Sequence, residues 1–437
     1  MLKGINMKLS VIGTGYVGTV TAACFAELGH EVICVDTDEK KVDMINSRQA
    51  PIIEDGLDEI LKRNVGVSLH ATNNYEEAVR NTDFSFICVG TPSDIDGNID
   101  LQPLKNACRC LGTNLRNKKK YHCVVVKSTV VPKTTEDVVI PIIEKESGKS
   151  AGSEFGVSMN PEFLREGKAV YDFMNPDKIV IGGIDKRSQL CVKELYDKID
   201  TNVSITDLKT AEMIKYVNNS FLATKVSFAN EIGNICKLMG INTYEVMEQV
   251  GKDFRISPHF LRSGAGFGGS CFPKDVRALI GKSIELGYDP KILQSVIELN
   301  EKQPLKVIDI LKKKMNKLEG TQITVLGLAF KSGTDDIRES SSIPIINYLL
   351  EKGAYVVAYD PLAMNNMRNV FSNIRYTSTI EEALENSDAC LLMTDWDEFR
   401  EIDNELNLMK RKLVIDARYV LNPNDIKADI EYEGLCW

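Results

Sequence analysis

The feature that most restricts the fold is a glycine-rich turn between a strand and a helix near the start of the chain. KLSVI at residues 8–12 reads as a buried strand, and GTGYVG follows at once with Gly13, Gly15 and Gly18. A helical pattern and a second strand, EVICVD, come next, and this strand ends in Asp36. Such a turn admits a dinucleotide pyrophosphate, and the acid binds the ribose hydroxyls. A glycine-rich turn without a ligand is the alternative, but the complete pattern favours a dinucleotide site.

The same region predicts a doubly wound sheet and a choice of cofactor. Asp36 would repel a 2′-phosphate, so the sequence favours NAD over NADP. Further strand-like runs recur, separated by helical segments, at residues 84–90, 122–129, 156–160 and 178–183. This alternation is typical of a parallel sheet with helices on both faces, and such sheets bind ligands beyond the carboxyl ends of their strands.

Polar residues follow three of these strand-like runs. They are Gly90-Thr91-Pro92, Ser128-Thr129 and Asn160-Pro161-Glu162. Each could be ordinary loop chemistry. Three together, at the edge where a nicotinamide would lie, indicate a binding or catalytic site instead.

A second sheet pattern begins at Gln322. Its strand-like runs are ITVLGLAF, AYVVAYD, ACLLMTD (389–395) and KLVIDAR (412–418). The glycine turn is degraded to GLAFKSG, so we expect an α/β domain that holds a nucleotide without a dinucleotide turn. Lys331, Arg338 and Arg418 lie at or after strand ends, where a phosphate or ribose would be bound.

Between the two sheet patterns the sequence is helical. Residues 207–238 have a wide apolar face and predict one long helix. Lys215 and Asn219 are four residues apart and share a side of it. A lysine on an apolar helix is usually a snorkelling surface residue, but beside Asn219 it is a candidate active-site cation. The helical middle also offers apolar surface for dimerisation.

The pattern as a whole predicts an α/β fold of two Rossmann-like doubly wound domains, joined by a central helical region that contains a long helix. We place the NAD-binding domain at residues 1–205, the central helical domain at 206–318 and the second nucleotide-binding domain at 319–437.

The central region contains a glycine-rich loop with a cysteine, GAGFGGSCFPKD at residues 264–275. Pro273 suits the first turn of a helix, so Cys271 should lie just before a helix N-terminus. That position lowers the pKa of a thiol and favours the nucleophilic thiolate. The alternative is a glycine-rich turn with a buried cysteine and with Asp275 supporting the helix dipole.

Composition excludes several classes of protein. A net charge of −9 over 437 residues argues against a general nucleic-acid binder. Several of the 11 cysteines lie in apolar strand-like runs, as reduced thiols of a cytoplasmic protein would. No pair has zinc-site spacing, so we expect no metal. No run of apolar residues is long enough to cross a membrane.

In order along nearly the whole chain, the sequence resembles the nucleotide-sugar dehydrogenases, in particular their UDP-glucose 6-dehydrogenase branch. The matching motifs are GTGYVG, VGTP, KSTVVP, NPEFLREG, EMIKYVNNSFLATKVSFANEI, GFGGSCFPKD and GLAFKSGTDDIRESSS. The resemblance implies oxidation of UDP-glucose to UDP-glucuronate with two NAD molecules per catalytic cycle. It also implies that residues 319–437 bind the UDP-sugar.

The resemblance implies a thiol mechanism. Cys271 would add to the intermediate aldehyde, and a second NAD would oxidise the resulting thiohemiacetal to a thioester for hydrolysis. Lys215 would stabilise the developing oxyanion, while Asn219 orients the sugar or a water molecule. Asp275 and Thr129 would position water and transfer protons.

It also implies the site residues. Glu162 would act as acid or base, which completes a catalytic set of Cys271, Lys215, Asp275, Asn219, Thr129 and Glu162. The NAD contacts would be Gly13, Gly15, Tyr16, Val17, Gly18, Asp36, Lys41, Thr91, Thr129, Glu166, Lys274 and Arg338. The substrate contacts would be Glu162, Phe163, Leu164, Lys215, Asn219, Arg255, Phe267, Gly268, Lys331 and Arg418. Arg255 matches a position that reaches into a neighbouring subunit's site, which implies a homodimer or a higher homo-oligomer.

The chain departs from the family pattern in two places. Where the family commonly has a glycine shortly after the proline of the KSTVVP motif, this chain reads VVPKTT. Lys41 stands where arginine is frequent in the family, so a compact ammonium group replaces a planar guanidinium group.

Other functions fit parts of the sequence. A GDP-mannose or UDP-amino-sugar 6-dehydrogenase would share the same chemistry. A two-electron hydroxyacid dehydrogenase would share the NAD domain and the lysine, but it has no use for a thiol. A non-catalytic regulator that binds NAD or a nucleotide sugar would not need Cys271, Lys215 and Asp275 together.

Overall fold

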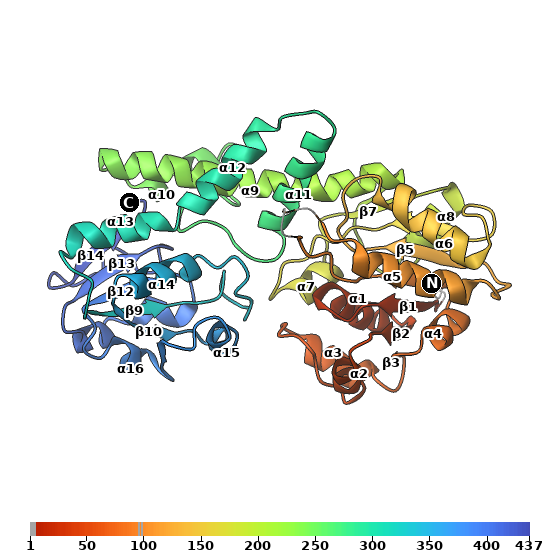
Figure 1. Ribbon diagram of the computed structural model, residues 1–437, viewed down its shortest axis with the longest axis horizontal. Coiled ribbons are helices and arrows are strands. Elements are labelled where there is room, and N and C mark those ends of the chain that lie inside the picture. Colours follow the sequence, from red (N-terminus) through yellow and green to blue (C-terminus); the bar gives the residue numbers. More distant parts are fainter. Residues whose placement is uncertain (1–5, 95–96, 98) are drawn as a thin grey trace. The chain divides into compact units, whose positions relative to one another are not determined.

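The computed structural model describes residues 6–94, 97 and 99–437. The chain forms two compact units, which we call the N-terminal unit (residues 1–218) and the C-terminal unit (residues 219–437). Each unit contains its own sheet with helices packed on it (Figure 1).

The sheet of the N-terminal unit has eight strands. In spatial order these are β3 (Leu69–Thr72), β2 (Glu31–Val35), β1 (Lys8–Ile12), β4 (Phe84–Ile87), β5 (Cys123–Val126), β6 (Gly156–Met159), β7 (Ile179–Gly183) and β8 (Val203–Thr206). The order reverses between β1 and β4, which is the topological switch point where doubly wound sheets bind dinucleotides. The prediction of a Rossmann-like fold is confirmed.

One part of the sheet differs from the expectation of parallel strands. Strand β7 pairs with β6 in antiparallel orientation, with Ser158 opposite Gly183, and β8 then runs parallel to β7. Parallel neighbours need a crossover over a face of the sheet. The β6–β7 connection instead contains only α7 (Ala169–Met174), which packs against α1. The chain therefore re-enters the sheet from the same end at which β6 leaves it.

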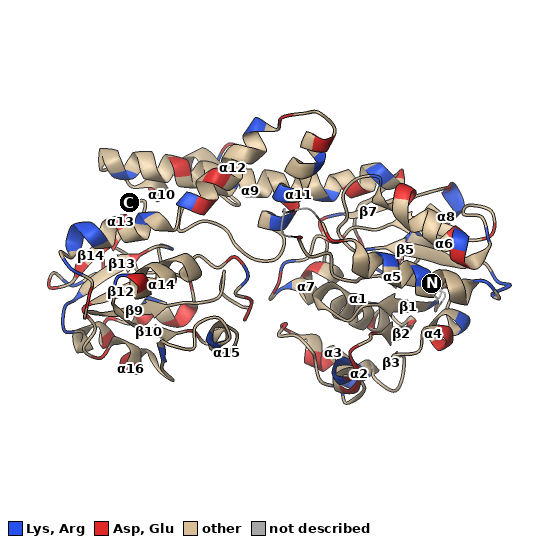
Figure 2. Ribbon diagram, viewed as in Figure 1, with Lys and Arg blue, Asp and Glu red and all other residues tan. Residues whose placement is uncertain are grey.

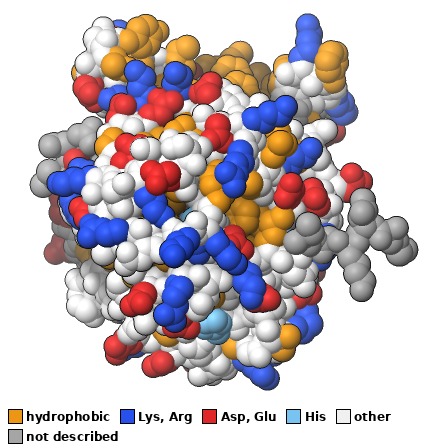
Figure 3. All heavy atoms as spheres, turned by 90° about the vertical axis from the view of Figure 1, so that its right-hand side faces the viewer, with side chains coloured by type: hydrophobic (Ala, Val, Ile, Leu, Met, Phe, Trp, Pro, Cys, Tyr) orange, Lys and Arg blue, Asp and Glu red, His pale blue; other side chains and the backbone are white. Residues whose placement is uncertain are grey.

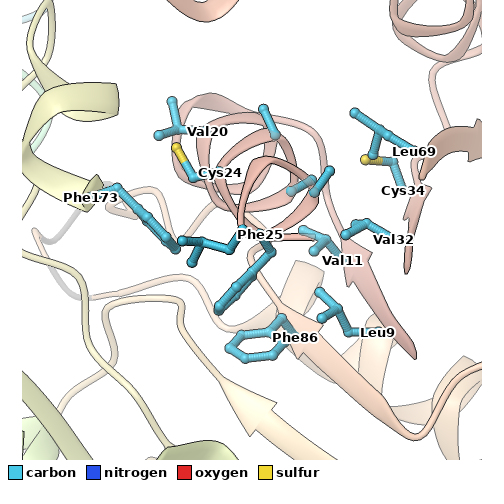
Figure 4. Close-up of a cluster of buried hydrophobic side chains, with 14 of the residues drawn as sticks. Leu9, Val11, Val20, Cys24, Phe25, Val32, Cys34, Leu69, Phe86 and Phe173 are labelled. Atoms are coloured by element: carbon cyan, nitrogen blue, oxygen red, sulfur yellow. The ribbon is translucent and has the colours of Figure 1, made fainter. Parts of the chain in front are cut away.

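Helices cover both faces of this sheet. Besides α7 they are α1 (Tyr16–Glu27), α2 (Glu39–Asn46), α3 (Leu57–Asn64), α4 (Tyr75–Asn81), α5 (Gln102–Leu115), a π-helical turn η1 (Thr135–Val139), α6 (Ile140–Ser147) and α8 (Lys186–Glu194). On one face Phe25 of α1 packs against Phe86 and Phe173, with ring centroids 5.2 Å apart in both pairs (Figure 4). The other face packs α5, η1 and the start of α9 over Val124, Val126 and Val157.

The predicted long helix is confirmed as α9, Leu208–Met239. In the C-terminal unit it is followed by α10 (Thr243–Gly251), α11 (Phe272–Glu285), α12 (Lys291–Lys302) and α13 (Leu305–Lys314). Ala223, Val276, Val296 and Ile297 form a small apolar core between α9, α11 and α12. The helical segment predicted after the cysteine loop is therefore three helices.

The sheet of the C-terminal unit has six strands, all parallel. In spatial order they are β11 (Arg375–Tyr376), β10 (Tyr355–Tyr359), β9 (Gln322–Leu326), β12 (Ala389–Leu392), β13 (Leu413–Asp416) and β14 (Glu431–Gly434). The accompanying helices are α14 (Ser342–Glu351), α15 (Met364–Arg368), α16 (Ile380–Leu384) and the 3-10 turns η2 (Asp397–Glu401) and η3 (Glu405–Leu408). The second Rossmann-like sheet is confirmed.

The surface carries charges of both signs. Lys and Arg residues are interspersed with Asp and Glu residues along the ribbon of both units (Figure 2), and their side chains are interspersed on the face of the N-terminal unit seen in Figure 3. A negatively charged ligand must therefore be held by local positive contacts rather than by a basic face. No described helix combines the length and apolar composition needed to cross a lipid bilayer.

Candidate active site

The glycine turn of the N-terminal unit has the geometry of a phosphate cradle. Gly13 has φ +90°, a conformation that favours glycine. A methyl group on Gly18 would lie 1.8 Å from the carbonyl oxygen of Gly13, so only glycine fits there. A methyl group on Gly15 would meet no atom within 4 Å, and the N-terminus of α1 opens directly after it at Tyr16. These residues fit a dinucleotide pyrophosphate at the helix N-terminus.

Asp36 lies beside this turn. Its carboxylate accepts hydrogen bonds from the N–H of Thr14 (2.6 Å), the hydroxyl of Thr14 (2.6 Å) and the N–H of Asp38 (3.0 Å). Burial alone would raise the pKa of Asp36, but these donors and the charge of Lys41 hold it below its ordinary value. Asp36 is only half-buried, so its carboxylate remains accessible to a ligand.

Two of the three polar strand ends are hydrogen-bonded to each other. The hydroxyl of Thr91, after β4, donates to the carbonyl oxygen of Thr129, after β5, at 2.9 Å. The hydroxyl of Ser128 donates to the carbonyl oxygen of Val89 at 2.7 Å. These bonds fix the two loops to each other at the carboxyl edge of the sheet.

The loop that contains Glu166 is held against the glycine turn. The N–H of Gly167 donates to the Tyr16 hydroxyl at 2.5 Å and to the carboxylate of Glu54 at 2.8 Å. Glu54 also accepts from the N–H of Ala169, at the start of α7, at 2.6 Å. Sequence analysis did not single out Glu54, because its partners are more than 100 residues away.

Glu162 and Lys215 form a buried ion pair. Lys215 Nζ lies 2.9 Å from the carboxylate, and the two side chains are 4% and 5% exposed. Burial alone raises the pKa of Glu162, but the Lys215 ammonium and the Leu164 N–H hold it below its ordinary value. An ionised Glu162 suits a base better than an acid. The ring of Phe163 lies next to this pair, 5.5 Å from Lys215 Nζ and 4.6 Å from Lys178 Nζ.

A second buried lysine lies close to this pair. Lys127 Nζ donates to the side-chain oxygen of Asn160 at 3.0 Å, and burial lowers its pKa to about 8. Tyr196 donates to the same oxygen at 2.6 Å. Lys127 belongs to the KSTVVP motif, but we gave it no role. A lysine that ends a continuous apolar strand could have been recognised as a buried cation.

In the C-terminal unit, Cys271 lies where the sequence predicts it, at the N-cap of α11. The thiol is half-buried, and its sulfur lies 3.4 Å from the hydroxyl of Ser270. One helical turn on, the carboxylate of Asp275 is buried and accepts from the Asn219 amide (2.7 Å) and from Lys274 Nζ (2.6 Å). Asn219, Lys274 and Asp275 therefore form one hydrogen-bonded group on the two helices beside the thiol.

The glycines before Cys271 allow close packing of the backbone. Gly266 and Gly269 have φ +95° and +82°. A methyl group on Gly268 would lie 2.3 Å from the carbonyl oxygen of Glu339, and one on Gly264 would lie 2.7 Å from that of Ala417. This packing accounts for the density of glycine in the loop.

Five other predicted residues divide into a group fixed by hydrogen bonds and a second group nearer the surface, in which Lys331 is half-buried. Arg418 is held by the carbonyl oxygens of Met393 (3.0 Å) and Gly266 (2.9 Å). Phe267 exchanges backbone hydrogen bonds with the side chain of Asn300. In the second group, Lys331 lies over the ring of Phe330, Arg338 pairs with Asp336, and Arg255 pairs with Asp253. Arg338 and Arg255 are exposed, with side chains 63% and 74% accessible.

Val17 packs against the apolar core around α1. Among the described residues, no three His, Cys, Asp or Glu side chains are grouped so that they could hold a metal ion.

Three family models match successive parts of the chain. They are the NAD binding domain of the UDP-glucose/GDP-mannose dehydrogenase family over residues 7–200, its central domain over 209–302 and its UDP binding domain over 324–423. The chain belongs to this family.

Family members of known structure and sequence are similar over their full length. UDP-glucose 6-dehydrogenase AglM of Haloferax volcanii is 48% identical over 98% of this chain and 100% of its own. GDP-mannose 6-dehydrogenase of Pseudomonas syringae is 40% identical over 99% and 100%. A UDP-glucose dehydrogenase from Pyrobaculum islandicum is 40% identical over 100% and 99%, with a TM-score of 0.94. As a member of the UDP-glucose/GDP-mannose dehydrogenase family, the protein is an NAD-dependent oxidoreductase.

Proposed function

We propose that the protein oxidises the C6 hydroxyl of UDP-glucose to a carboxylate, with two NAD molecules per sugar. The supporting relatives are UDP-glucose 6-dehydrogenases from Haloferax volcanii and Bacillus subtilis, at 48% and 41% identity. GDP-mannose 6-dehydrogenases follow at 40%. GDP-mannose is therefore the second candidate substrate.

The observation that carries the proposal is the Cys271 thiol at the N-terminus of α11, next to the buried carboxylate of Asp275. A helix N-terminus favours a thiolate. An enzyme that stops at the aldehyde needs no such group, whereas an enzyme that proceeds to the acid must hold the aldehyde and activate it a second time.

Bound NAD supplies the hydride acceptor for both oxidations. In the first, a hydride leaves C6 and the hydroxyl proton passes to a base, which gives the aldehyde. The Cys271 thiolate then adds to the aldehyde carbon, and the oxygen takes up a proton to give a thiohemiacetal. Loss of a second hydride and a proton gives a thioester. Water attacks the thioester and releases the carboxylate and the thiol.

The side chains have charges that suit these steps. Lys215 is held as a cation by Glu162 and would stabilise the oxyanion of each addition step. Glu162 is ionised and would accept protons. Asp275, oriented by Asn219, would position the attacking water with Thr129. Gly13, Gly15, Gly18 and Asp36 would hold NAD in the N-terminal unit.

We further propose that the protein acts as a homodimer. In the C-terminal unit α9 exposes large apolar side chains, among them Phe221, Phe228 and Leu238 at 64%, 50% and 87%. Arg255 is exposed next to Phe254, which is 92% exposed. Exposed apolar groups of this size are typical of an interaction surface. We expect Arg255 to reach the substrate of the second copy.

We also propose a cytoplasmic location and the three-domain division into residues 1–205, 206–318 and 319–437. All eleven cysteines are thiols rather than disulfides, as in a reducing compartment.

The test is to follow NADH while the protein is supplied with NAD and UDP-glucose, GDP-mannose or UDP-N-acetyl sugars. We expect UDP-glucose to have the highest kcat/KM and to yield two NADH per sugar consumed. A higher kcat/KM for GDP-mannose would show that GDP-mannose, and not UDP-glucose, is the substrate. A yield of one NADH would overturn the thiol chemistry.

A further inference from the structure

A buried carboxylate outside the set described so far holds the loop after β5 by hydrogen bonds. We call this carboxylate, that of Glu212, and its bonds to Lys133 and Thr135 the clamp. Glu212 lies on α9, three residues before Lys215, and its side chain is fully buried. One oxygen accepts from the N–H of Lys133 at 2.6 Å. The other accepts from the N–H and the hydroxyl of Thr135, at 2.8 and 2.6 Å. Because η1 begins at Thr135, this carboxylate also satisfies the N-terminal donors of a helical run.

The clamp holds a residue in a conformation that it would not adopt by itself. Lys133 has φ +77°, in the left-handed region that favours glycine. Its side chain is exposed, so side-chain packing does not explain the conformation. Lys133 lies in the VVPKTT segment. The carboxylate of Glu212 gives the Lys133 N–H a fixed acceptor in this conformation.

The clamped backbone leads directly to Thr129. Only Val130, Val131 and Pro132 separate Thr129 from Lys133; Val130 is fully buried and Pro132 has a fixed φ. At its other end the segment is held by the bond from Thr91 to the Thr129 carbonyl oxygen. The segment is therefore fixed at both ends, and Glu212 is the end that belongs to α9.

We infer that Glu212 is a positioning residue, which holds Thr129 in place by keeping Lys133 in its left-handed conformation. The inference rests on the role proposed for Thr129 in the reaction. Because Glu212 and Lys215 lie on the same turn of α9, the clamp also fixes the Thr129 loop to the helix that carries the catalytic lysine.

The test is a cycle of three variants, Glu212→Gln, Lys133→Gly and the double variant. Glutamine keeps the shape of the Glu212 side chain, but it places an NH₂ group where one carboxylate oxygen accepts from Lys133 or Thr135. We expect E212Q to lower kcat by about ten- to hundredfold, since small displacements of catalytic groups have effects of this size. K133G should keep the activity of the natural chain, because glycine adopts positive φ without cost. The double variant should recover most of the activity lost in E212Q.

Amide hydrogen exchange gives a readout that does not depend on turnover. E212Q should increase exchange at Lys133 and Thr135, and K133G should not. The matched control is Asp185→Asn, which alters another carboxylate that accepts a backbone N–H, that of Ser188 at the N-cap of α8. D185N should lower Tm without changing kcat or the exchange of residues 128–135. If UDP-glucose is not a substrate, the exchange result still tests the clamp.

If E212Q fails to fold, Lys133→Val tests the same idea with Glu212 intact. A β-branched residue at positive φ opposes the clamp and should lower kcat, while the exposed side chain leaves the core unchanged. The inference is overturned if the double variant is as slow as E212Q, or if E212Q and K133V lose no more kcat than D185N does.

Discussion

The two sheets begin with the same local structure but use it differently. In the N-terminal unit Gly13 has φ +90° and Asp36, after β2, accepts hydrogen bonds from Thr14. In the C-terminal unit Gly327 has φ +98° and Asp360, after β10, accepts from the N–H groups of Leu328 and Ala329. Each acid therefore closes the turn that follows the first strand of its sheet.

The difference lies in what remains available to a ligand. Asp360 is fully buried, and five donors use both of its oxygens. Asp36 is half-buried and accepts from Thr14 and Asp38 alone among the described residues. Helix α1 begins four residues after β1, whereas α14 begins sixteen residues after β9. The first turn therefore leaves an acid and a helix N-terminus accessible to a ligand, whereas the acid of the second turn is enclosed by its donors.

The largest effect is expected for Asp360→Asn. An amide cannot accept from donors at both of its ends, so at least one of the five donors loses its partner inside the protein. We expect a loss of about 3 kcal/mol in the free energy of unfolding. Urea denaturation measures it. NAD affinity should not change; a weaker NAD complex would show that this acid serves the cofactor after all.

Next in size is Gly18→Ala. The added methyl group would lie 1.8 Å from the carbonyl oxygen of Gly13 and would force the turn apart. We expect NAD affinity to fall about hundredfold, or about 2.7 kcal/mol, as measured by fluorescence titration. Binding of UDP to the C-terminal unit should be unchanged. Gly15→Ala is the matched control, because its methyl group meets no atom.

Asp36→Asn should have a smaller effect, on the cofactor rather than on stability. Loss of the charged acceptor should weaken NAD about tenfold and narrow the preference for NAD over NADP. The ratio of the two dissociation constants measures this. If D36N unfolded as readily as D360N and bound NAD normally, Asp36 would serve stability rather than the cofactor.

The smallest effect concerns pH. It extends the comparison to Glu212, a third acid, which is buried and accepts hydrogen bonds from Lys133 and Thr135. Burial raises the pKa of Glu212 from 4.5 to about 7. Folding therefore favours its protonated form, so its contribution to stability is complete below about pH 4.5 and is lost as the pH rises through 7. The difference in stability between the natural chain and E212Q should shrink from pH 5.5 to pH 8. A difference that grows over this range would contradict the raised pKa.

Local sequence predicted much of the fold and the positions of some candidate site residues. Gly13, Gly15 and Gly18 predicted the turn between β1 and α1, and Pro273 predicted that Cys271 precedes α11, because turns and helix termini depend on neighbouring residues. The apolar face of residues 207–238 gave α9.

Features that depend on distant residues were not predicted. The edge strands β3, β8, β11 and β14 are short or polar, since edges are only partly buried. The reversal at β7 depends on how the connection packs. Glu54, Lys127 and Glu212 act through partners 33 to 116 residues away. Asp360 follows the same strand pattern as Asp36, but it is fully buried and also accepts from the Ala363 N–H and the Trp396 ring N–H.

The central claim is that the sulfur of Cys271 carries the sugar between the two oxidations. The most direct measurement is to quench the protein with acid during turnover of NAD and UDP-glucose and to map its peptides by mass spectrometry, with Asp275→Asn used to slow hydrolysis of the thioester. We predict a UDP-glucuronyl adduct on the peptide that contains Cys271, and its absence in Cys271→Ala, which has no nucleophile at this position. Two NADH per sugar with no adduct on that peptide, or an adduct elsewhere in the chain, would contradict the account.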